Sequence, residues 1–134
     1  MEFYGHEITK AAIKDHRVFA GLIVDDPAKF ADLFMQPQFK LACYGIDGNE
    51  CGWVVYEIVN STFVFHLVNF TQVSGQQDIT DMVFDQLVRP VCNHNALEYV
   101  QASVERAGMA RKLKSKGFER YSGRVYRGEV SHVF

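Results

Sequence analysis

The hydrophobic positions in the middle of the chain follow the pattern of β-strands. Three runs rich in aromatic and β-branched residues cover residues 39–45, 51–59 and 63–70. Asp47-Gly48-Asn49 and Asn60-Ser61 lie between these runs and favour tight turns. The pattern predicts an antiparallel meander of three strands. Near-continuous apolar stretches within the runs indicate that both faces of the sheet are covered.

Helical spacing is found in the segments on either side. The predicted helices cover residues 10–23, 27–35, 78–89 and 106–116, and strands are expected at 1–8, 97–105 and 121–129. In the second helix, Asp26 is placed as the N-cap and Pro27 as the first helical residue, and Gln36-Pro37 ends it. Pro90 is expected to end or bend the third helix.

The last predicted helix has a clear end signal. Gly117 stands where a left-handed residue closes many helices, and this placement lets Phe118 fold back on Leu113 in a Schellman motif. No internal repeat, low-complexity tract or linker interrupts the sequence. The order of elements therefore predicts a single α+β domain over residues 1–134.

Composition limits the class of protein. The 134 residues are 48% hydrophobic and 22% charged, which excludes a disordered chain, a collagen-like fibre and a coiled-coil rod. No apolar run approaches the ~18 residues that cross a bilayer, and the start MEFYGHEITK has no signal-peptide pattern. The odd number of cysteines, 3, favours reduced thiols. We therefore expect a cytoplasmic protein without a membrane segment.

Charge is distributed unevenly along the chain. Residues 106–127 contain eight basic side chains and one acid, Glu119, although the whole chain has a net charge of -2. Such a basic end often contacts phosphates, nucleic acid or an acidic protein surface. A solvated helix face followed by a polar outer strand explains the same residues. The candidate partner-binding residues are Arg111, Lys112, Lys114, Arg120 and Arg124.

The segment RAGMARKLKSKGF, residues 106–118, resembles the last helix of the GNAT superfamily of acyl-CoA-dependent N-acyltransferases, which ends in a Gly-Phe pair before the final hairpin. The order of elements over residues 39–127 is similar to that family as well. The resemblance implies a mixed, mostly antiparallel sheet of about six to seven strands with helices on both faces. It also implies acetyl transfer from acetyl-CoA to a primary amine, with the pantetheine arm pairing along a splayed fourth strand.

The pyrophosphate cradle of the family has the pattern Gln/Arg-x-x-Gly-x-Gly/Ala, in which glycines let backbone N–H groups approach phosphate oxygens. Gln72 and Gly75 match its first two positions, whereas Gln77 stands where the family has Gly or Ala. Asp78 and Asp81 place negative charge beside the expected phosphates, although helix capping explains both residues too. The resemblance thus implies acetyl-CoA binding through a degenerate motif. The candidate cofactor-binding residues are Leu67, Val68, Asn69, Gln72, Gly75, Gln76 and Gln77.

The chemistry of the family also needs a proton donor and a base. The family often has a tyrosine four residues before the helix-ending glycine, and this position is Leu113 here, which cannot donate a proton. Glu57 and His66 are the candidate catalytic residues, because a carboxylate or an imidazole could deprotonate an ammonium group through water. A hydrogen-bonded sheet histidine is the alternative interpretation of His66. Ser103, on the strand expected at 97–105, could also line a cleft.

The sequence gives no pattern for a metal site. Cys92-Asn93-His94 supplies two potential ligands, but no second pair follows at zinc-site spacing. The remaining histidines are scattered along the chain without a metal-binding motif. We therefore expect no metal cofactor.

Two functional hypotheses follow from these observations. The first is a GNAT-like acetyltransferase that acts on a small amine. The second is a non-catalytic protein on the same scaffold, of the kind that bacteriophages encode, which binds a protein or nucleic-acid partner through the basic C-terminal end.

Overall fold

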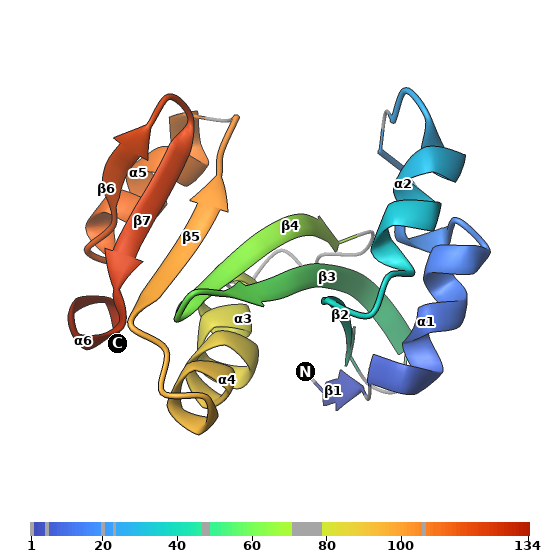
Figure 1. Ribbon diagram of the computed structural model, residues 1–134, viewed down its shortest axis with the longest axis horizontal. Coiled ribbons are helices and arrows are strands. Elements are labelled where there is room, and N and C mark those ends of the chain that lie inside the picture. The colour runs from blue at the N-terminus through green and yellow to red at the C-terminus, as the bar shows by residue number, and fades with distance from the viewer. Residues whose placement is uncertain are drawn as a thin grey trace.

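The computed structural model describes residues 2–4, 6–19, 21–22, 24–46, 49–70, 79–105 and 107–134. Among these residues, seven strands form one sheet in the order β1-β2-β3-β4-β5-β7-β6 (Figure 1). The strands are β1 (Glu2–Tyr4), β2 (Phe39–Ile46), β3 (Asn49–Val59), β4 (Thr62–Phe70), β5 (Tyr99–Ser103), β6 (Glu119–Ser122) and β7 (Val125–Glu129). The helical elements are α1 (His6–Lys14), the 3₁₀ turn η1 (Arg17–Phe19), α2 (Pro27–Phe34), α3 (Ile79–Val83), the π turn η2 (Phe84–Val88), α4 (Arg89–His94), α5 (Ala107–Ser115) and α6 (Val130–Val133). Within the described ranges, none of these helices has the length and apolarity to cross a membrane.

The sheet confirms the predicted α+β class, because it is mixed and mostly antiparallel. β1 to β4 form an antiparallel meander, and β5, β7 and β6 are also antiparallel to one another. β4 and β5 form a parallel pair between these two groups. Asn60 and Ser61 both have left-handed backbone conformations, with φ of 47° and 61°, which gives the tight turn predicted between β3 and β4. β5 is shorter than the strand expected at 97–105.

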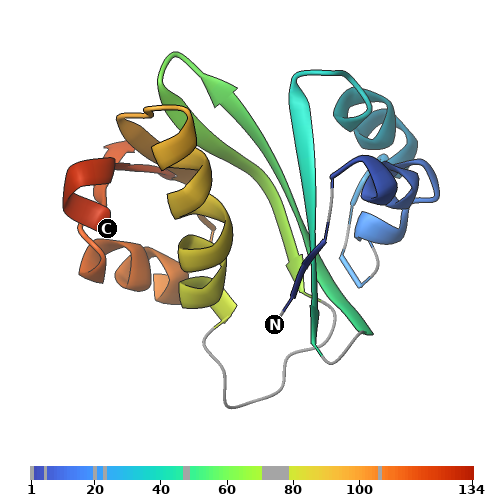
Figure 2. The ribbon, with the colours of Figure 1, turned by 90° about the horizontal axis from the view of Figure 1, so that it is seen from below.

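Helices cover both faces of the sheet, as the apolar runs predicted (Figure 2). α1, η1 and α2 lie on one face, which we call the α1–α2 face. There, Leu41 of β2 and Val55 of β3 form a core with Ile13 and Phe34 of the helices. This core extends over the first strands of the sheet and includes the partly buried Leu67 of β4 at its border.

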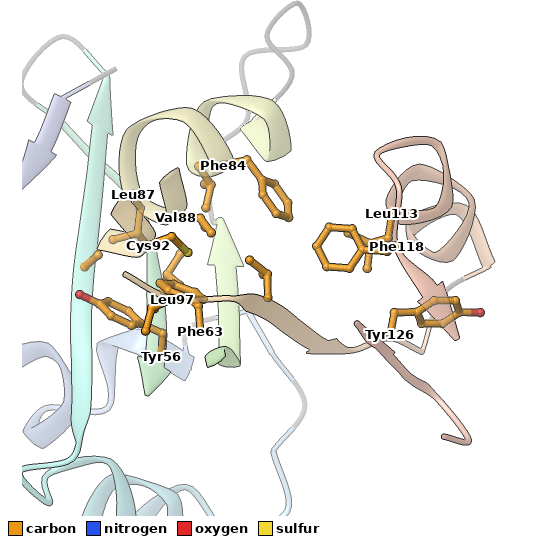
Figure 3. Packing of buried hydrophobic residues seen from close by; sticks show 14 of the residues in the cluster. Tyr56, Phe63, Phe84, Leu87, Val88, Cys92, Leu97, Leu113, Phe118 and Tyr126 are labelled. Carbon is orange, nitrogen blue, oxygen red and sulfur yellow. The ribbon is translucent and has the colours of Figure 1, made fainter. Parts of the chain in front are cut away.

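The second core lies on the opposite face, which we call the α3–α4 face, and it crosses most of the sheet (Figure 3). Tyr56 and Phe63 stack there with ring centroids 4.6 Å apart. Leu87 and Cys92 from the helical segment pack over these strands, and Phe118 extends the same core toward α5. The α3–α4 face is thus closed by apolar side chains from β2 to β7.

The N-terminal segment differs from the prediction. The strand expected at 1–8 is limited to β1, and α1 begins already at His6. Strand propensity depends strongly on context, and only three residues pair with β2 here. The helix expected at 10–23 ends at Lys14, because His16 adopts a left-handed conformation with φ of 62° and the chain turns back into η1.

α2 forms as the capping residues predicted. Asp26 accepts a hydrogen bond through Oδ1 from the backbone N–H of Lys29 at 3.1 Å, and Pro27 opens the helix. At the other end, Lys10 of α1 donates through Nζ to the carbonyls of Phe34 at 2.7 Å and Phe39 at 2.9 Å. Burial lowers the pKa of Lys10, and the nearby charge of Lys40 lowers it further. Lys10 therefore ties α1 to the end of α2 and the start of β2.

Pro90 does not end the helical segment after the meander, so of the two outcomes expected there, an end or a bend, the end is wrong. α3, η2 and α4 follow one another without a break to His94. The N–H of Arg89 bonds to the carbonyl of Phe84, five residues earlier, in the π turn. The wider π turn relieves the clash that a proline ring makes with the preceding helical turn, so the helix continues past Pro90.

The C-terminal segment confirms the predicted helix end and corrects the final strand. Gly117 has φ of 104°, and the N–H of Phe118 bonds to the carbonyl of Leu113 at 3.0 Å, as in a Schellman motif. The single strand expected at 121–129 is a hairpin of β6 and β7 instead. Gly123, with φ of 54°, supplies the turn between them.

Candidate active site

β4 and β5 separate soon after they begin. Their parallel pairing is limited to Thr62–Val64 on β4 and Tyr99–Gln101 on β5. From Phe65 onward, the side of β4 that faces β5 has no partner strand within the described chain. Figure 1 shows β4 and β5 close together where they begin and well apart where they end. The splayed fourth strand that the resemblance implied is therefore present.

A β-bulge on β4 places His66 at the start of this separation. In the β3–β4 ladder, Tyr56 pairs with Phe65 and Val55 pairs with Leu67, so His66 is an extra residue on β4. An extra residue shifts the alternation of side chains along a strand. As a result, His66 and Leu67 both face the α1–α2 side, where His66 contacts Phe39 edge-to-face at 4.9 Å.

The two predicted catalytic residues lie side by side. Nε2 of His66 is 2.8 Å from Oε1 of Glu57, and both side chains are mostly shielded, with 29% and 21% of their surfaces exposed. Glu57 is the neighbour of Val64 across the β3–β4 ladder, at the end of the parallel pairing. A carboxylate that faces Nε2 favours the tautomer with the proton on that nitrogen and leaves the Nδ1 lone pair able to accept a proton.

A row of side chains continues from this pair across the sheet on the same face. The register places Glu57 beside Val64, Val64 beside Gln101 and Gln101 beside Arg127. A cleft of about 370 Å³ lies along this row. Its lining includes Glu57, Val59, Asn60, Thr62, Val64, Tyr99, Gln101 and Arg127. Glu57 is therefore the predicted catalytic residue that faces the cleft, and His66 supports it from the neighbouring strand.

The candidate cofactor residues on β4 have different environments. Leu67 is partly buried against the α1–α2 core, and Val68 is 47% exposed. Asn69 is buried, and its Nδ2 donates a hydrogen bond to the carbonyl of Val18 at 2.7 Å. The side chain of Asn69 thus anchors η1 on the sheet, which leaves the backbone of this strand as the group that could contact a ligand. Gln72, Gly75, Gln76 and Gln77 lie outside the described residues.

Two lysines neutralise the negative charge of Asp81. Asp81 should therefore oppose phosphate binding less than the sequence suggested. Nζ of Lys116 forms a hydrogen-bonded ion pair with Oδ1 of Asp81, and Nζ of Lys112 lies 3.8 Å from Oδ2. Two cations therefore face one carboxylate at the start of the α3–α4 segment. Asp78, the second acid of that expectation, lies outside the described residues.

The candidate partner-binding residues do not share one role. Lys112 is paired with Asp81, and Lys114 lies over the ring of Tyr126 at 5.9 Å. Arg124 lies 3.9 Å from Glu105, with both side chains largely exposed. Arg111 is exposed on α5, and Arg120 lines a small cleft beside β6. Part of the basic end therefore makes contacts within the molecule.

The remaining residues considered in the sequence analysis lie away from the cleft. Leu113 is buried in the α3–α4 core, so this position stabilises the packing of α5. Ser103 is exposed at the end of β5. Burial raises the pKa of the Cys92 thiol to about 11. Among the described residues, no group of three His, Cys, Asp or Glu side chains could hold a metal ion.

Sequence analysis did not identify the residues of the far half of the cleft. Gln101 and Arg127 are 26 residues apart, yet Nε and Nη2 of Arg127 donate to Oε1 of Gln101 at 3.3 and 3.0 Å. The signal in the sequence was a strand, 97–105, that alternates polar and apolar residues, which indicates one face turned away from the core. Only the register of β5 with β7 reveals which polar residues meet there.

Comparison with known proteins bears on the fold. No protein-family model matches the sequence, and no curated protein matches it. Solved structures match over nearly the whole chain. One is a variant of spermidine N-acetyltransferase from Vibrio cholerae, with a TM-score of 0.73 and 10% identity over 100% of this chain and 98% of that chain.

Two further matches have similar coverage. A GNAT-family acetyltransferase from Staphylococcus aureus has a TM-score of 0.67 and 9% identity over 96% of this chain and 98% of that chain. The PaiA N-acetyltransferase from Thermoplasma acidophilum, solved in complex with coenzyme A, has a TM-score of 0.64 and 11% identity over 96% and 99% of the two chains. With its splayed β4 and β5 and this likeness along its whole length, the chain has the fold of the GNAT acetyltransferases.

Proposed function

We propose that this chain is an N-acyltransferase that transfers an acetyl group from acetyl-CoA to a primary amine. The observation that carries the proposal is the Glu57–His66 pair, which lies where β4 separates from β5. An amine attacks a thioester only as the free base, so the reaction needs a proton acceptor beside the amine. A hydrogen-bonded carboxylate–imidazole pair meets that requirement.

The open edge of β4 supports binding of an acyl-CoA. Leu67, Val68 and Asn69 lie on the part of β4 that has no partner strand on the β5 side within the described chain, so a pantetheine arm can pair with this edge through its amides. The T. acidophilum structure carries coenzyme A on the same fold. When bound, acetyl-CoA would supply the thioester carbonyl that the amine attacks. The C–N bond would form, the C–S bond would break, and coenzyme A would leave as a thiolate that takes up a proton from water. Gln72, Gly75, Gln76 and Gln77 are the proposed contacts to its phosphates.

Glu57 and His66 divide the work of proton transfer in this proposal. Glu57 lines the cleft and places negative charge next to the ammonium group of the acceptor. His66 does not line the cleft, so it takes the proton at Nδ1 through a water molecule. The resulting imidazolium is stabilised by Glu57 through the Nε2 hydrogen bond of 2.8 Å. The contacts of His66 with Phe34 and Phe39 fix the orientation of its ring.

The size of the cleft supports a small amine as the acceptor. A volume of about 370 Å³ is in the range of small-molecule sites. One of the structural neighbours is a spermidine N-acetyltransferase, and spermidine is a small amine. The carboxylate of Glu57 gives the cleft a group that attracts a cationic amine.

Calorimetric titration with acetyl-CoA, with desulfo-CoA as a control for reactions of the thiol, tests the proposal first. Micromolar binding would support it, and a screen of primary amines for release of free CoA would follow. No heat and no thermal shift at millimolar acetyl-CoA would contradict the proposal. The search would then turn to partners of the basic C-terminal end.

Variants of the pair test the chemistry. We expect Glu57→Gln and His66→Asn each to lower kcat about 100-fold, because each removes general-base catalysis. Thermal unfolding of both variants should stay close to that of the wild type, since both side chains lie outside the cores. His94→Asn, at an exposed histidine of α4, is the matched control and should keep full activity. Wild-type rates in both pair variants would exclude this pair as the base.

A further inference from the structure

Arg127 is held in a fixed position at the far end of the cleft. It lies on β7 beside Gln101 of β5, and its Nε and Nη2 both donate to Oε1 of Gln101. The guanidinium carbon also lies 5.0 Å from the ring centre of Tyr99 and 4.3 Å from that of Tyr121. Two aromatic rings and one amide therefore restrain a side chain that is otherwise flexible.

The positive charge of Arg127 is not neutralised by an acid of the described chain. No carboxylate oxygen in that part of the molecule lies within 4.0 Å of its nitrogens. Glu119 is the cross-strand neighbour of Arg127 but forms no ion pair with it. Glu129 is the cross-strand partner of Tyr99, and its Oε2 lies 3.3 Å from Nδ1 of His132. Oε1 of Gln101 accepts hydrogen bonds from the N–H of Nε and from one N–H of Nη2. The other N–H groups of the guanidinium can therefore donate to a ligand.

The cleft has opposite charges at its two ends. Glu57 and Arg127 both line it, and β4 and β5 lie between their strands. Neighbouring strands are about 4.8 Å apart, so the two backbones are separated by roughly 14 Å. The side chain of Arg127 leans toward β5 through its bonds to Gln101, which shortens the distance between the charged groups. A ligand with one charge at each end would have to be several bonds long.

We propose that the acceptor is an amine that also carries a carboxylate, separated from the amine by a chain of several atoms. This inference rests on the proposed function and names the class of its acceptor. The carboxylate binds the guanidinium of Arg127, which offers donors in the planar geometry that a carboxylate accepts. The ammonium group then lies at Glu57, next to His66. Tyr99 and Tyr121 position the arginine, and Gln101 fixes its plane.

Binding of three probes without acetyl-CoA tests this inference. The probes are 6-aminohexanoate, hexylamine and hexanoate, and their dissociation constants are measured from amide chemical shifts of isotope-labelled protein. We expect 6-aminohexanoate to bind about tenfold more tightly than either probe with a single charge. In Arg127→Gln, this preference over hexylamine should disappear, and Arg127→Lys should keep only part of it. Arg89→Gln removes the same charge on the opposite face and should keep the preference in full.

Two results would overturn the inference. One is equal binding of hexylamine and 6-aminohexanoate by the wild-type protein. The other is a preference that survives in a folded Arg127→Gln variant, or that survives undiminished in a folded Arg127→Lys variant. Because the probes are titrated without acetyl-CoA, the outcome is separate from the proposed reaction. A protein that binds 6-aminohexanoate through Arg127 but shows no acetyl-CoA binding would retain the two-charge binding site and lose the proposed function, so the two failures are distinguishable.

Discussion

The two faces of the sheet are covered to different extents, although the same strands form both. On the α3–α4 face, the described apolar side chains form one core from Ala42 of β2 to Tyr126 of β7. On the α1–α2 face, the core ends at Leu67 of β4, and the strands beyond it carry Gln101 and Arg127. The helices on the α3–α4 face therefore pack over most of the sheet and stabilise it. The helices on the α1–α2 face cover only the first strands and stop where the cleft begins.

Because of this difference, one face of the sheet contributes most of the stability and the other carries the candidate active site. A face closed over most of its area by an apolar core can accept only apolar residues there without a large cost, because unpaired polar groups are expensive to bury. The half-covered face can hold Glu57, His66 and Arg127 in hydrogen bonds that are partly open to water. Substitutions on the two faces should therefore affect different properties.

The largest effect on stability is expected for Phe63, which is fully buried on the α3–α4 face. Phe63→Ala should lower the free energy of unfolding by about 3–5 kcal/mol, because it removes a stacked ring and leaves a cavity. Val64→Ala, at the next residue on the opposite face, should cost about 1 kcal/mol or less. Urea denaturation measures both. Equal losses would show that the two faces contribute equally to stability.

A pH effect of intermediate size is expected for Tyr56 on the same face. Burial raises its pKa from 10.0 to about 12. The unfolded chain ionises near pH 10, so the folded state retains a proton that the unfolded state loses. Stability should thus be intact below pH 10 and fall as the pH rises toward 12.

The Tyr56→Phe variant removes this titration from both states. Between pH 9 and pH 11.5 it should lose roughly 2 kcal/mol less stability than the wild type, as measured by denaturation at each pH. Tyr44 has a raised pKa from the same cause, so part of the alkaline loss remains. An identical alkaline loss in variant and wild type would rule out burial of the Tyr56 hydroxyl as its source.

The smallest effect concerns the basic residues of α5. Lys112→Glu replaces a cation whose Nζ lies 3.8 Å from Oδ2 of Asp81 with an acid, and it should cost at most about 1 kcal/mol, because surface ion pairs are weak. Arg111→Glu, at the preceding exposed residue, is the matched control and should leave thermal unfolding unchanged. If both variants bind acetyl-CoA normally but lose the same protein from a pull-down, the basic end has a partner of its own.

Much of the fold could be predicted from local sequence signals. Turn residues at Asn60-Ser61, the cap at Asp26 and the end signal at Gly117 each placed an element correctly. The predicted element boundaries were wrong where the backbone conformation of the fold differed from what the local sequence favours. The π turn before Pro90 allowed a helix to continue, and Gly123 divided a single expected strand into a hairpin.

The candidate site was predictable only as separate residues. Glu57 and His66 were chosen for their chemistry, but their contact depends on a register shift between β3 and β4 that no local pattern announces. Arg127 and Gln101 meet through the pairing of β5 with β7, which is non-local as well. The proposed phosphate contacts at Gln72 and Gly75 remain predictions.

The bulge at His66 also determines how tolerant β4 is to changes in chain length. Before it, odd-numbered residues such as Phe63 and Phe65 point to the α3–α4 face, and after it Leu67 and Asn69 point to the other. One residue thus reverses the phase of the strand halfway along its length. Deleting His66 would turn the side chain of Asn69 to the α3–α4 face and break its hydrogen bond to the carbonyl of Val18. The bulge at His66 therefore also determines which residues in the second half of β4 face each helical layer.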